Sequence, residues 1–275
     1  MMYPATRKGI DEANRALLEE LHARATGPLT AADAASLLGL DLARTRRLLA
    51  YLAGRGWLSR VRHGLYTTVP LGAAYPSEWR EDPWIVAATA FAPCYIGGFS
   101  ACEHWGLTDQ IFRDIVIITG AAQRETSVTI QETVFRLKFL PEEKHFGTRP
   151  VWREQTKVSV SDASRTVVDI LDDPRLGGGI RHVAEVVTAY FDGEHRDDDR
   201  LFDYAMRLGN RAVLKRLGFI VETMGIDAPS VVERCLSALS RGVSSLDPSI
   251  STKGHITKRW NLRVNVALNP RGEDA

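Results

Sequence analysis

The sequence predicts an α+β protein in which three short helices and a β-hairpin precede a larger mixed α/β domain with a small sheet and several helices. Three observations support this. Apolar residues recur at helical spacing through residues 11–54, two β-rich runs flank a glycine in residues 57–69, and the remaining chain mixes apolar strands with amphipathic helices. Because 275 residues exceed the common size of one domain, we expect two domains, at 1–72 and 80–275.

The first two helices are predicted from apolar spacing and from capping residues. Residues 11–25 carry apolar side chains at intervals of three and four, and Gly27 follows them as a helix terminator. Thr30 can cap a second, short helix that runs to Leu38, with Asp33 as its capping-box partner. Gly39 and the residue after it then form a turn.

The third helix is expected from Asp41, as N-cap, to Gly54. One side of it is an apolar stripe that can dock on the first two helices, formed by Leu42, Leu48, Leu49 and Leu52 with Thr45 among them. The opposite side carries polar residues that point into solvent or into a groove, namely Arg44, Arg46, Arg47 and Tyr51. This side is interpreted either as a recognition helix for DNA or as an ordinary solvated basic face.

The hairpin favours the first interpretation. Runs 57–61 and 65–69 are rich in β-forming residues and flank a turn at Gly64, so helix, turn, helix and hairpin together make a winged helix-turn-helix. Residues 1–75 hold ten Lys and Arg against six Asp and Glu, whereas the remainder holds 25 against 28. We therefore predict contacts to double-stranded DNA, with a protein-interaction module as the alternative. The predicted contact residues are Arg44, Arg46, Arg47, Tyr51, Arg60, Arg62 and His63.

The second domain follows a proline-containing connector at residues 70–83. Strands are expected at 94–96, 114–119, 128–140 (one or two) and 156–160, and helices at 84–91, 99–105, 161–171, 181–191, 199–208, 210–224 and 229–239. Ser161 is the expected cap of its helix, and Arg165 and Asp169 are expected to pair on that helix's surface. An alternating run at 260–268 is expected to add a last strand to the sheet.

The C-terminal segment is basic. From Lys253 to Arg263 there are four Lys and Arg residues and no Asp or Glu. Two interpretations remain open, a second phosphate contact and an exposed strand face, of which the second is favoured.

No catalytic or cofactor motif stands out. Cys94, Cys102 and His104 lack a fourth zinc ligand, and the order Asp114, Glu142, Lys144 imitates a metal-dependent nuclease without its strand context. We therefore expect no metal, no cofactor and no enzymatic activity, and reduced cysteines in a core. Without an apolar span or signal peptide, the protein is expected to be cytoplasmic, with no membrane partner.

Three further segments, beyond the winged helix, carry a family resemblance: YIGGFSACEHWGLTDQIFRDIVIIT (95–119), VSVSDASRTVVDIL (158–171) and NRAVLKRLGFIVETMG (210–225). In this order they resemble the AbiEi family of toxin-antitoxin antitoxins. The resemblance implies a DNA-binding antitoxin of a type IV system that represses its own operon through the winged helix. It also implies that the C-terminal domain counteracts a nucleotidyltransferase-like toxin, with direct contact left open. Two other hypotheses remain: an enzyme that modifies the toxin or nucleic acid, and an adaptor that binds protein but not DNA.

Overall fold

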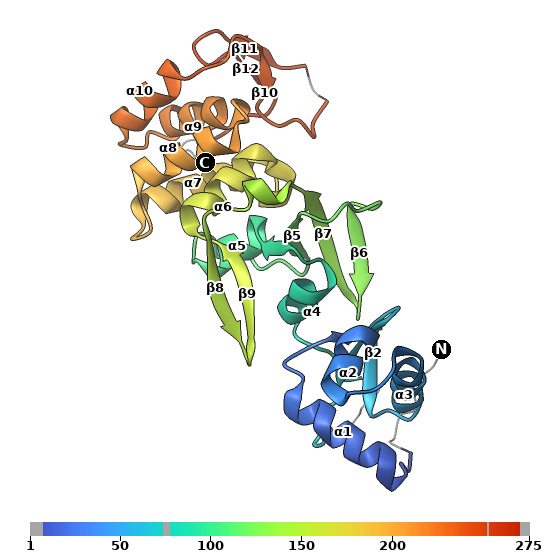
Figure 1. Ribbon diagram of the computed structural model, residues 1–275. Helices are drawn as coiled ribbons and strands as arrows, with labels where there is room; N and C mark the ends of the chain where they lie inside the picture. The colour runs from blue at the N-terminus through green and yellow to red at the C-terminus, as the bar shows by residue number, and fades with distance from the viewer. Residues whose placement is uncertain (1–7, 74–77, 252, 270–275) are drawn as a thin grey trace. The chain divides into compact units, whose positions relative to one another are not determined.

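The chain forms two compact units in the computed structural model, which describes residues 8–73, 78–251 and 253–269 (Figure 1). The first unit comprises Met1–Ala92, Ser127–Phe135 and Val151–Val158. The second comprises Pro93–Thr126, Arg136–Pro150 and Ser159–Ala275. Helices alternate with several small sheets, which confirms the predicted α+β class. Within the described part of the chain, no helix is long and apolar enough to cross a membrane.

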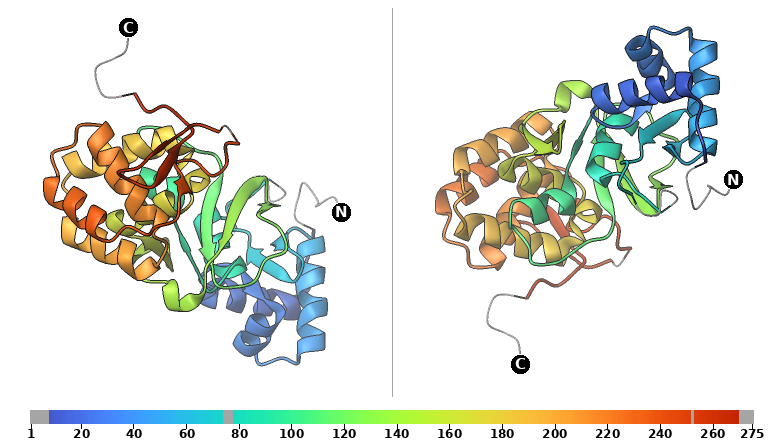
Figure 2. Two further views of the ribbon diagram at one scale, coloured as in Figure 1. Left: turned by 90° about the horizontal axis from the view of Figure 1, so that it is seen from above. Right: turned by 90° about the horizontal axis from the view of Figure 1, so that it is seen from below.

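The first unit begins with the predicted helix-turn-helix and hairpin, drawn in blue and cyan in both views of Figure 2. Its elements are α1 (Glu12–Arg24), β1 (Leu29–Thr30), α2 (Ala31–Leu38), α3 (Leu42–Gly54), β2 (Leu58–Arg62) and β3 (Leu65–Thr68). The strands form one sheet in the order β1-β3-β2. Thr30 and Asp33 make the predicted capping box, which confirms the start of α2.

The core of these elements is built from the apolar sides of the three helices. Leu21 of α1 and Leu49 and Leu52 of α3 have no exposed surface, and Thr45 is equally buried. One member of the predicted stripe is placed wrongly, because Leu42 is 41% exposed. Leu42 is the first residue of α3, so it lies beyond the reach of the packed turns.

A six-stranded sheet has the order β6-β7-β5-β4-β9-β8. Its strands are β4 (Cys94–Ile96), β5 (Ile115–Thr119), β6 (Ser127–Ile130), β7 (Thr133–Phe139), β8 (Thr148–Arg153) and β9 (Thr156–Ser161). The run 128–140 is therefore two strands, and β8 was not predicted. β8 lies at an edge and exposes most of its residues, so it shows no buried alternation that would reveal a strand.

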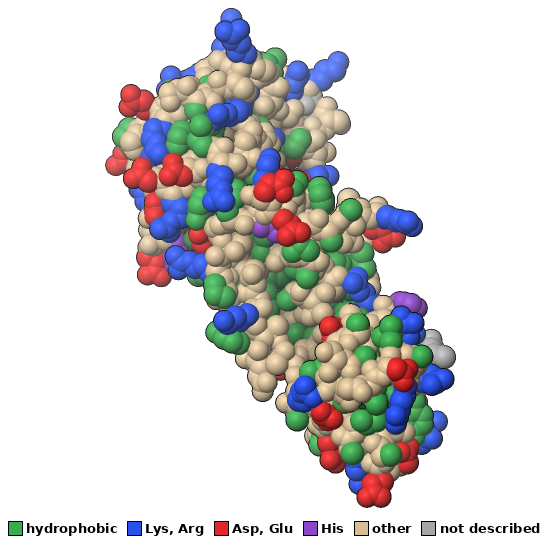
Figure 3. Space-filling model, in the orientation of Figure 1, with side chains coloured by type: hydrophobic (Ala, Val, Ile, Leu, Met, Phe, Trp, Pro, Cys, Tyr) green, Lys and Arg blue, Asp and Glu red, His purple; other side chains and the backbone are tan. Residues whose placement is uncertain are grey.

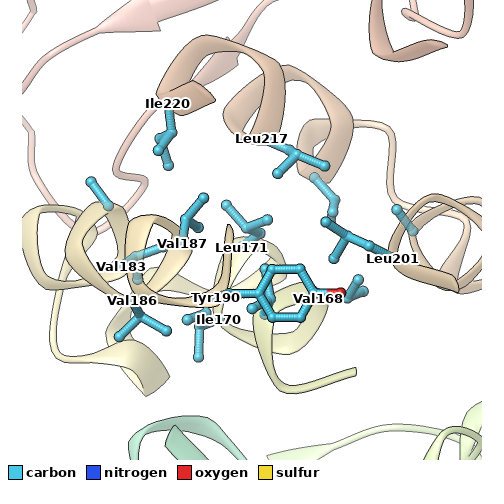
Figure 4. Close-up of a cluster of buried hydrophobic side chains, with 14 of the residues drawn as sticks. Val168, Ile170, Leu171, Val183, Val186, Val187, Tyr190, Leu201, Leu217 and Ile220 are labelled. Atoms are coloured by element: carbon cyan, nitrogen blue, oxygen red, sulfur yellow. The ribbon is translucent and has the colours of Figure 1, made fainter. Parts of the chain in front are cut away.

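Helices make up most of the second unit, while α4 (Pro83–Ala90) belongs to the first. They are α5 (Gly98–His104), α6 (Ala163–Asp172), α7 (Ile180–Asp192), α8 (Asp198–Leu208), α9 (Ala212–Thr223) and α10 (Pro229–Ser237), with short 3-10 turns η1 (Glu142–Lys144) and η2 (Pro174–Gly177). The central helix is α6, which packs against α5, α7, α8 and α9. Figure 4 shows its side chains Val168 and Leu171 among those of α7 and α9.

The start and the charges of α6 differ from expectation. Ser161 ends β9, and Asp162 is the N-cap, since its carboxylate accepts a hydrogen bond from the Arg165 backbone N–H at 2.8 Å. Arg165 and Asp169 do pair, at 2.9 Å, but in the core and not on the surface, with side chains 0% and 5% exposed.

Tyr95 of β4 completes this buried group. Its hydroxyl donates to Asp169 at 3.0 Å and accepts from Arg165 at 2.8 Å. Burial raises the pKa of Asp169, although the nearby Arg165 opposes that shift. Since removing one partner would leave a buried charge unpaired, we expect such a loss to cost about 3–5 kcal/mol.

The last strands form a separate sheet, so the prediction that the C-terminal run joins the main sheet is wrong. The order is β10-β12-β11, with β10 at Ser244–Ser245, β11 at His255–Thr257 and β12 at Leu262–Val264. Trp260, in the β11–β12 turn, is 1% exposed and lies against Gly218 of α9. Its indole N–H donates to Glu222 at 2.6 Å. Packing of the Trp260 side chain against α9, and not strand pairing to the main sheet, therefore fastens the C-terminal segment to the second unit.

The Trp260 contact gives a test of the fold. A β-carbon added at Gly218 would lie 2.0 Å from the Trp260 ring, so we expect Gly218→Ala to lower the free energy of unfolding by about 1–3 kcal/mol. The matched control is Gly54→Ala at the end of α3, where nothing lies within 4 Å. It should be neutral or stabilise by up to about 1 kcal/mol. Urea unfolding would measure both, and equal effects would contradict the packing.

Candidate nucleic-acid interface

The start of α3 is fixed by the turn that joins it to α2. Gly39, with φ of 64°, closes α2 in the left-handed conformation, which L side chains rarely adopt. Asp41 then caps α3, since its carboxylate accepts a hydrogen bond from the Arg44 backbone N–H at 2.8 Å. The hydroxyl of Thr45 donates to the Asp41 carbonyl at 2.9 Å on the buried side. The turn between α2 and α3 is thus defined by local hydrogen bonds.

The exposed side of α3 carries three arginines whose guanidinium groups have no partner among the described residues. Arg44, Arg46 and Arg47 are all exposed. In the parts of the chain that the structure describes, no hydrogen bond or ion pair engages their guanidinium groups. Figure 3 shows Lys and Arg side chains over the region that holds α3. Arginine at such a surface can reach phosphates or the O6/N7 edge of guanine. The face therefore has the chemistry required to bind duplex DNA.

Tyr51, the fourth predicted residue of α3, is half-buried and already engaged. Its hydroxyl donates to the Asp11 carboxylate at 3.3 Å, and the guanidinium of Arg55 lies 4.8 Å from its ring centre. Asp11 in turn caps α1 through the Asn14 backbone N–H. Tyr51 thus links α3 to the start of α1.

The wing is an irregular hairpin. Arg60 pairs with Tyr66 and Arg62 with Leu65, so the register shifts between Arg60 and Arg62. A β-bulge of this kind re-aims the residues beyond it. Gly64 takes φ of 76° at the turn. Of the predicted wing residues, Arg62 and His63 are exposed and Arg60 is partly exposed.

Arg62 contacts the end of α4 in the first unit. One of its terminal nitrogens donates to the Ala90 carbonyl at 2.5 Å, and its guanidinium lies 5.6 Å from the centre of the Phe91 ring. Ala90 and Phe91 are buried at the end of α4. The side chain predicted as a wing contact therefore fastens the wing to α4.

Two further contacts brace the hairpin, and sequence reasoning missed both. The Gln131 amide donates to the Ser59 hydroxyl at 3.1 Å, and the Thr67 hydroxyl donates to Glu81 at 2.6 Å. Burial raises the pKa of Glu81. Ser59 and Gln131 are 72 residues apart, so no local pattern signals their contact.

The weak catalytic candidates lie in other settings. The Asp114 carboxylate forms an ion pair with Arg136 at 2.6 Å, and the Lys144 ammonium donates to the Leu208 carbonyl at 3.0 Å. Burial raises the pKa of Cys94 to about 12 and raises that of Cys102 as well, so both thiols are protonated at neutral pH. Over the described residues, no three His, Cys, Asp or Glu side chains gather as a metal site.

Comparison with known proteins finds a family match for the N-terminal region. Residues 16–69 match a family model described as "Transcriptional regulator, AbiEi antitoxin", so this region carries the helix-turn-helix domain of that family. The matched residues run from α1 through β3. No curated protein matches the chain. Among solved structures, the RV2827C protein from Mycobacterium tuberculosis is similar, with a TM-score of 0.64 and 16% identity over 95% of this chain and 94% of that one. At this identity the likeness shows a shared fold.

The contrast between Arg62 and the α3 arginines can be measured. We expect Arg62→Ala to lower the free energy of unfolding by about 1–3 kcal/mol, because it removes a charged hydrogen bond and a cation–π contact. Arg46 is also exposed but makes no such contact among the described residues, so Arg46→Ala should change the free energy of unfolding by less than about 0.5 kcal/mol. Chemical unfolding followed by circular dichroism would compare the two, and a stability loss for Arg46→Ala as large as for Arg62→Ala would refute the distinction.

Proposed function

We propose that the chain is a duplex-DNA-binding antitoxin that represses its own toxin-antitoxin operon. The observation that carries the proposal is the exposed side of α3, where Arg44, Arg46 and Arg47 point away from the core with their charges uncommitted. The match of residues 16–69 to a transcriptional regulator family supports it. The operator would lie in the chain's own promoter, and the DNA contacts would come chiefly from α3.

The wing has a narrower role in this proposal than the sequence suggested. His63 and Arg60 are available for backbone contacts, whereas Arg62, although exposed, has one of its terminal nitrogens bonded to the Ala90 carbonyl. Tyr51 acts by positioning α3, since its hydroxyl is bonded to Asp11. We therefore infer that Arg44, Arg46 and Arg47 contribute most of the binding and that Arg60 and His63 add to it.

The second unit would supply the antitoxin activity. We propose that it counteracts a nucleotidyltransferase-like toxin encoded beside this chain and that it does so without an enzymatic step. Support comes from the resemblance of segments 95–119, 158–171 and 210–225 to the AbiEi family. The described Asp114 and Lys144 groups are engaged with other residues, which favours the non-enzymatic role. A nucleotidyltransferase reading frame next to the gene would add independent support.

Salt-dependent binding to a promoter fragment tests the DNA contact. For Arg44→Ala/Arg46→Ala/Arg47→Ala, we expect the slope of log K against log salt concentration to fall by roughly 0.9 for each phosphate contact removed. Arg15→Ala on α1 is the control, because it removes an exposed charge from a helix outside the helix-turn-helix reading face. If the triple variant kept wild-type affinity and slope, α3 would not be the DNA-binding element.

The two activities should separate in cells. We expect the same triple variant to fail to repress a reporter behind its own promoter, yet to rescue growth when the neighbouring toxin is expressed from an independent promoter. The reason is that the substitutions lie on the surface of the first unit, while the antitoxin role is assigned to the second. Reporter output and growth would be measured in parallel at matched protein levels. Loss of both activities in a folded variant would argue against this division of labour.

A further inference from the structure

The segment that forms the small C-terminal sheet has a strongly one-sided charge. Over residues 241–251 and 253–269 it holds a single carboxylate, that of Asp247, which is 2% exposed. The Asp247 oxygens accept from the Ile180 backbone N–H at 3.2 Å and from the backbone N–H and the hydroxyl of Ser249 at 2.9 and 2.5 Å. The cations of the same segment lie at the surface and are Arg241, Lys253, Lys258, Arg259 and Arg263. Buried negative charge and surface positive charge leave this sheet basic.

One of these cations serves as an anchor. The Arg259 guanidinium forms an ion pair with Glu222 at 2.6 Å, beside the bond from the Trp260 indole to the same carboxylate. With Trp260 buried against α9, the β11–β12 turn is held in a fixed position. Lys258 is exposed in this anchored turn. The charge of Arg259 is therefore neutralised by Glu222, whereas the charge of Lys258 faces solvent.

The remaining cations are distributed along the hairpin. The Asn261 amide donates to the Ser240 carbonyl at 3.2 Å, which brings the residue before Arg241 to the turn. Further along, Arg263 pairs with Ile256 and donates to the Lys253 carbonyl at 3.0 Å. Lys258 follows Lys253 by five positions, a span of at most about 17 Å in an extended chain. Because duplex DNA rises 3.4 Å per step, that span corresponds to about five phosphates of one strand.

We propose that Arg241, Lys253 and Lys258 form a second site for the phosphate backbone of duplex DNA, here called the C-terminal basic surface, in which Arg263 positions Lys253 through its hydrogen bond to the Lys253 carbonyl. The inference rests on the proposed function in that it supposes the chain's partner to be DNA. Figure 3 shows blue side chains over the end of the second unit that carries β10–β12, with red ones set away from it. Two of these three cations are lysines, a residue that is depleted in protein–protein interfaces and that serves in sequence-independent phosphate binding. The surface would add affinity without reading sequence.

The test compares two double variants of the full chain. In Lys253→Gln/Lys258→Gln both side chains are exposed, so the fold is kept. We expect its affinity for a long promoter fragment at 0.1 M salt to fall by roughly eightfold for each phosphate that is no longer bound, and the log-log salt slope to fall by about 1.8 for two phosphates. Arg113→Gln/Arg124→Gln removes the same charge from exposed positions elsewhere in the second unit and should leave both values unchanged.

The outcomes separate this inference from the proposed function. If the α3 triple variant loses binding while Lys253→Gln/Lys258→Gln binds like the wild type, the C-terminal basic surface is overturned and the α3 proposal stands. If Lys253→Gln/Lys258→Gln weakens binding while the α3 variant does not, the C-terminal basic surface stands and the α3 proposal is overturned. A single-stranded RNA of equal length is tested in parallel. Weakening confined to the RNA, or equal weakening by both double variants, would also overturn the duplex-DNA site.

Discussion

Burial of apolar helix surface is the constraint on which both units depend, and its extent decides which side chains can act. In α3 only one side is covered, by α2 and β2, so the leucines enter the core and Arg44, Arg46 and Arg47 stay in solvent. In α6 every side is covered, and all residues from Ala163 to Leu171 are buried. Because a charge in such a position needs a partner, α6 keeps its arginine only together with Asp169 and Tyr95. The same residue type thus stays in solvent in one helix and forms part of the core in the other.

The wing shows how a surface hairpin becomes part of a larger unit. A two-stranded hairpin is marginally stable alone, and this one is braced by residues distant in sequence. Arg62 bonds to the Ala90 carbonyl, Ser59 to Gln131 and Thr67 to Glu81. These hydrogen bonds join the hairpin to α4, to the β6–β7 turn and to Glu81, so the exposed His63 at its tip is held at a defined position. Preorganisation of this kind lowers the entropic cost of binding a rigid duplex.

How much could be predicted follows from the range of the interactions involved. The helix-turn-helix was predictable because its capping box, its turn glycine and its leucine spacing are all local, and the structure places them within a residue or two of expectation. The separate C-terminal sheet was not, because the alternation at 260–268 reveals a strand and says nothing of its neighbours. Arg165 and Asp169 form the expected pair, but its burial could not be predicted, because burial depends on which helices cover α6. For the candidate site, the sequence could predict that Arg44, Arg46 and Arg47 face outward, but not that Arg62 is bonded to Ala90.

The near-neutral net charge of +1 is compatible with a nucleic-acid partner because charge acts locally. At physiological salt the Debye length is about 8 Å, so a phosphate responds to the few charges nearest to it and hardly to the total. In this chain several carboxylates form ion pairs with a neighbouring arginine: Asp169 with Arg165, Asp114 with Arg136 and Glu222 with Arg259. The arginines of α3 have no such partners among the described residues. A protein arranged in this way presents basic surfaces to DNA while its total charge stays small, and its binding should therefore depend on salt far more steeply than a net charge of +1 suggests.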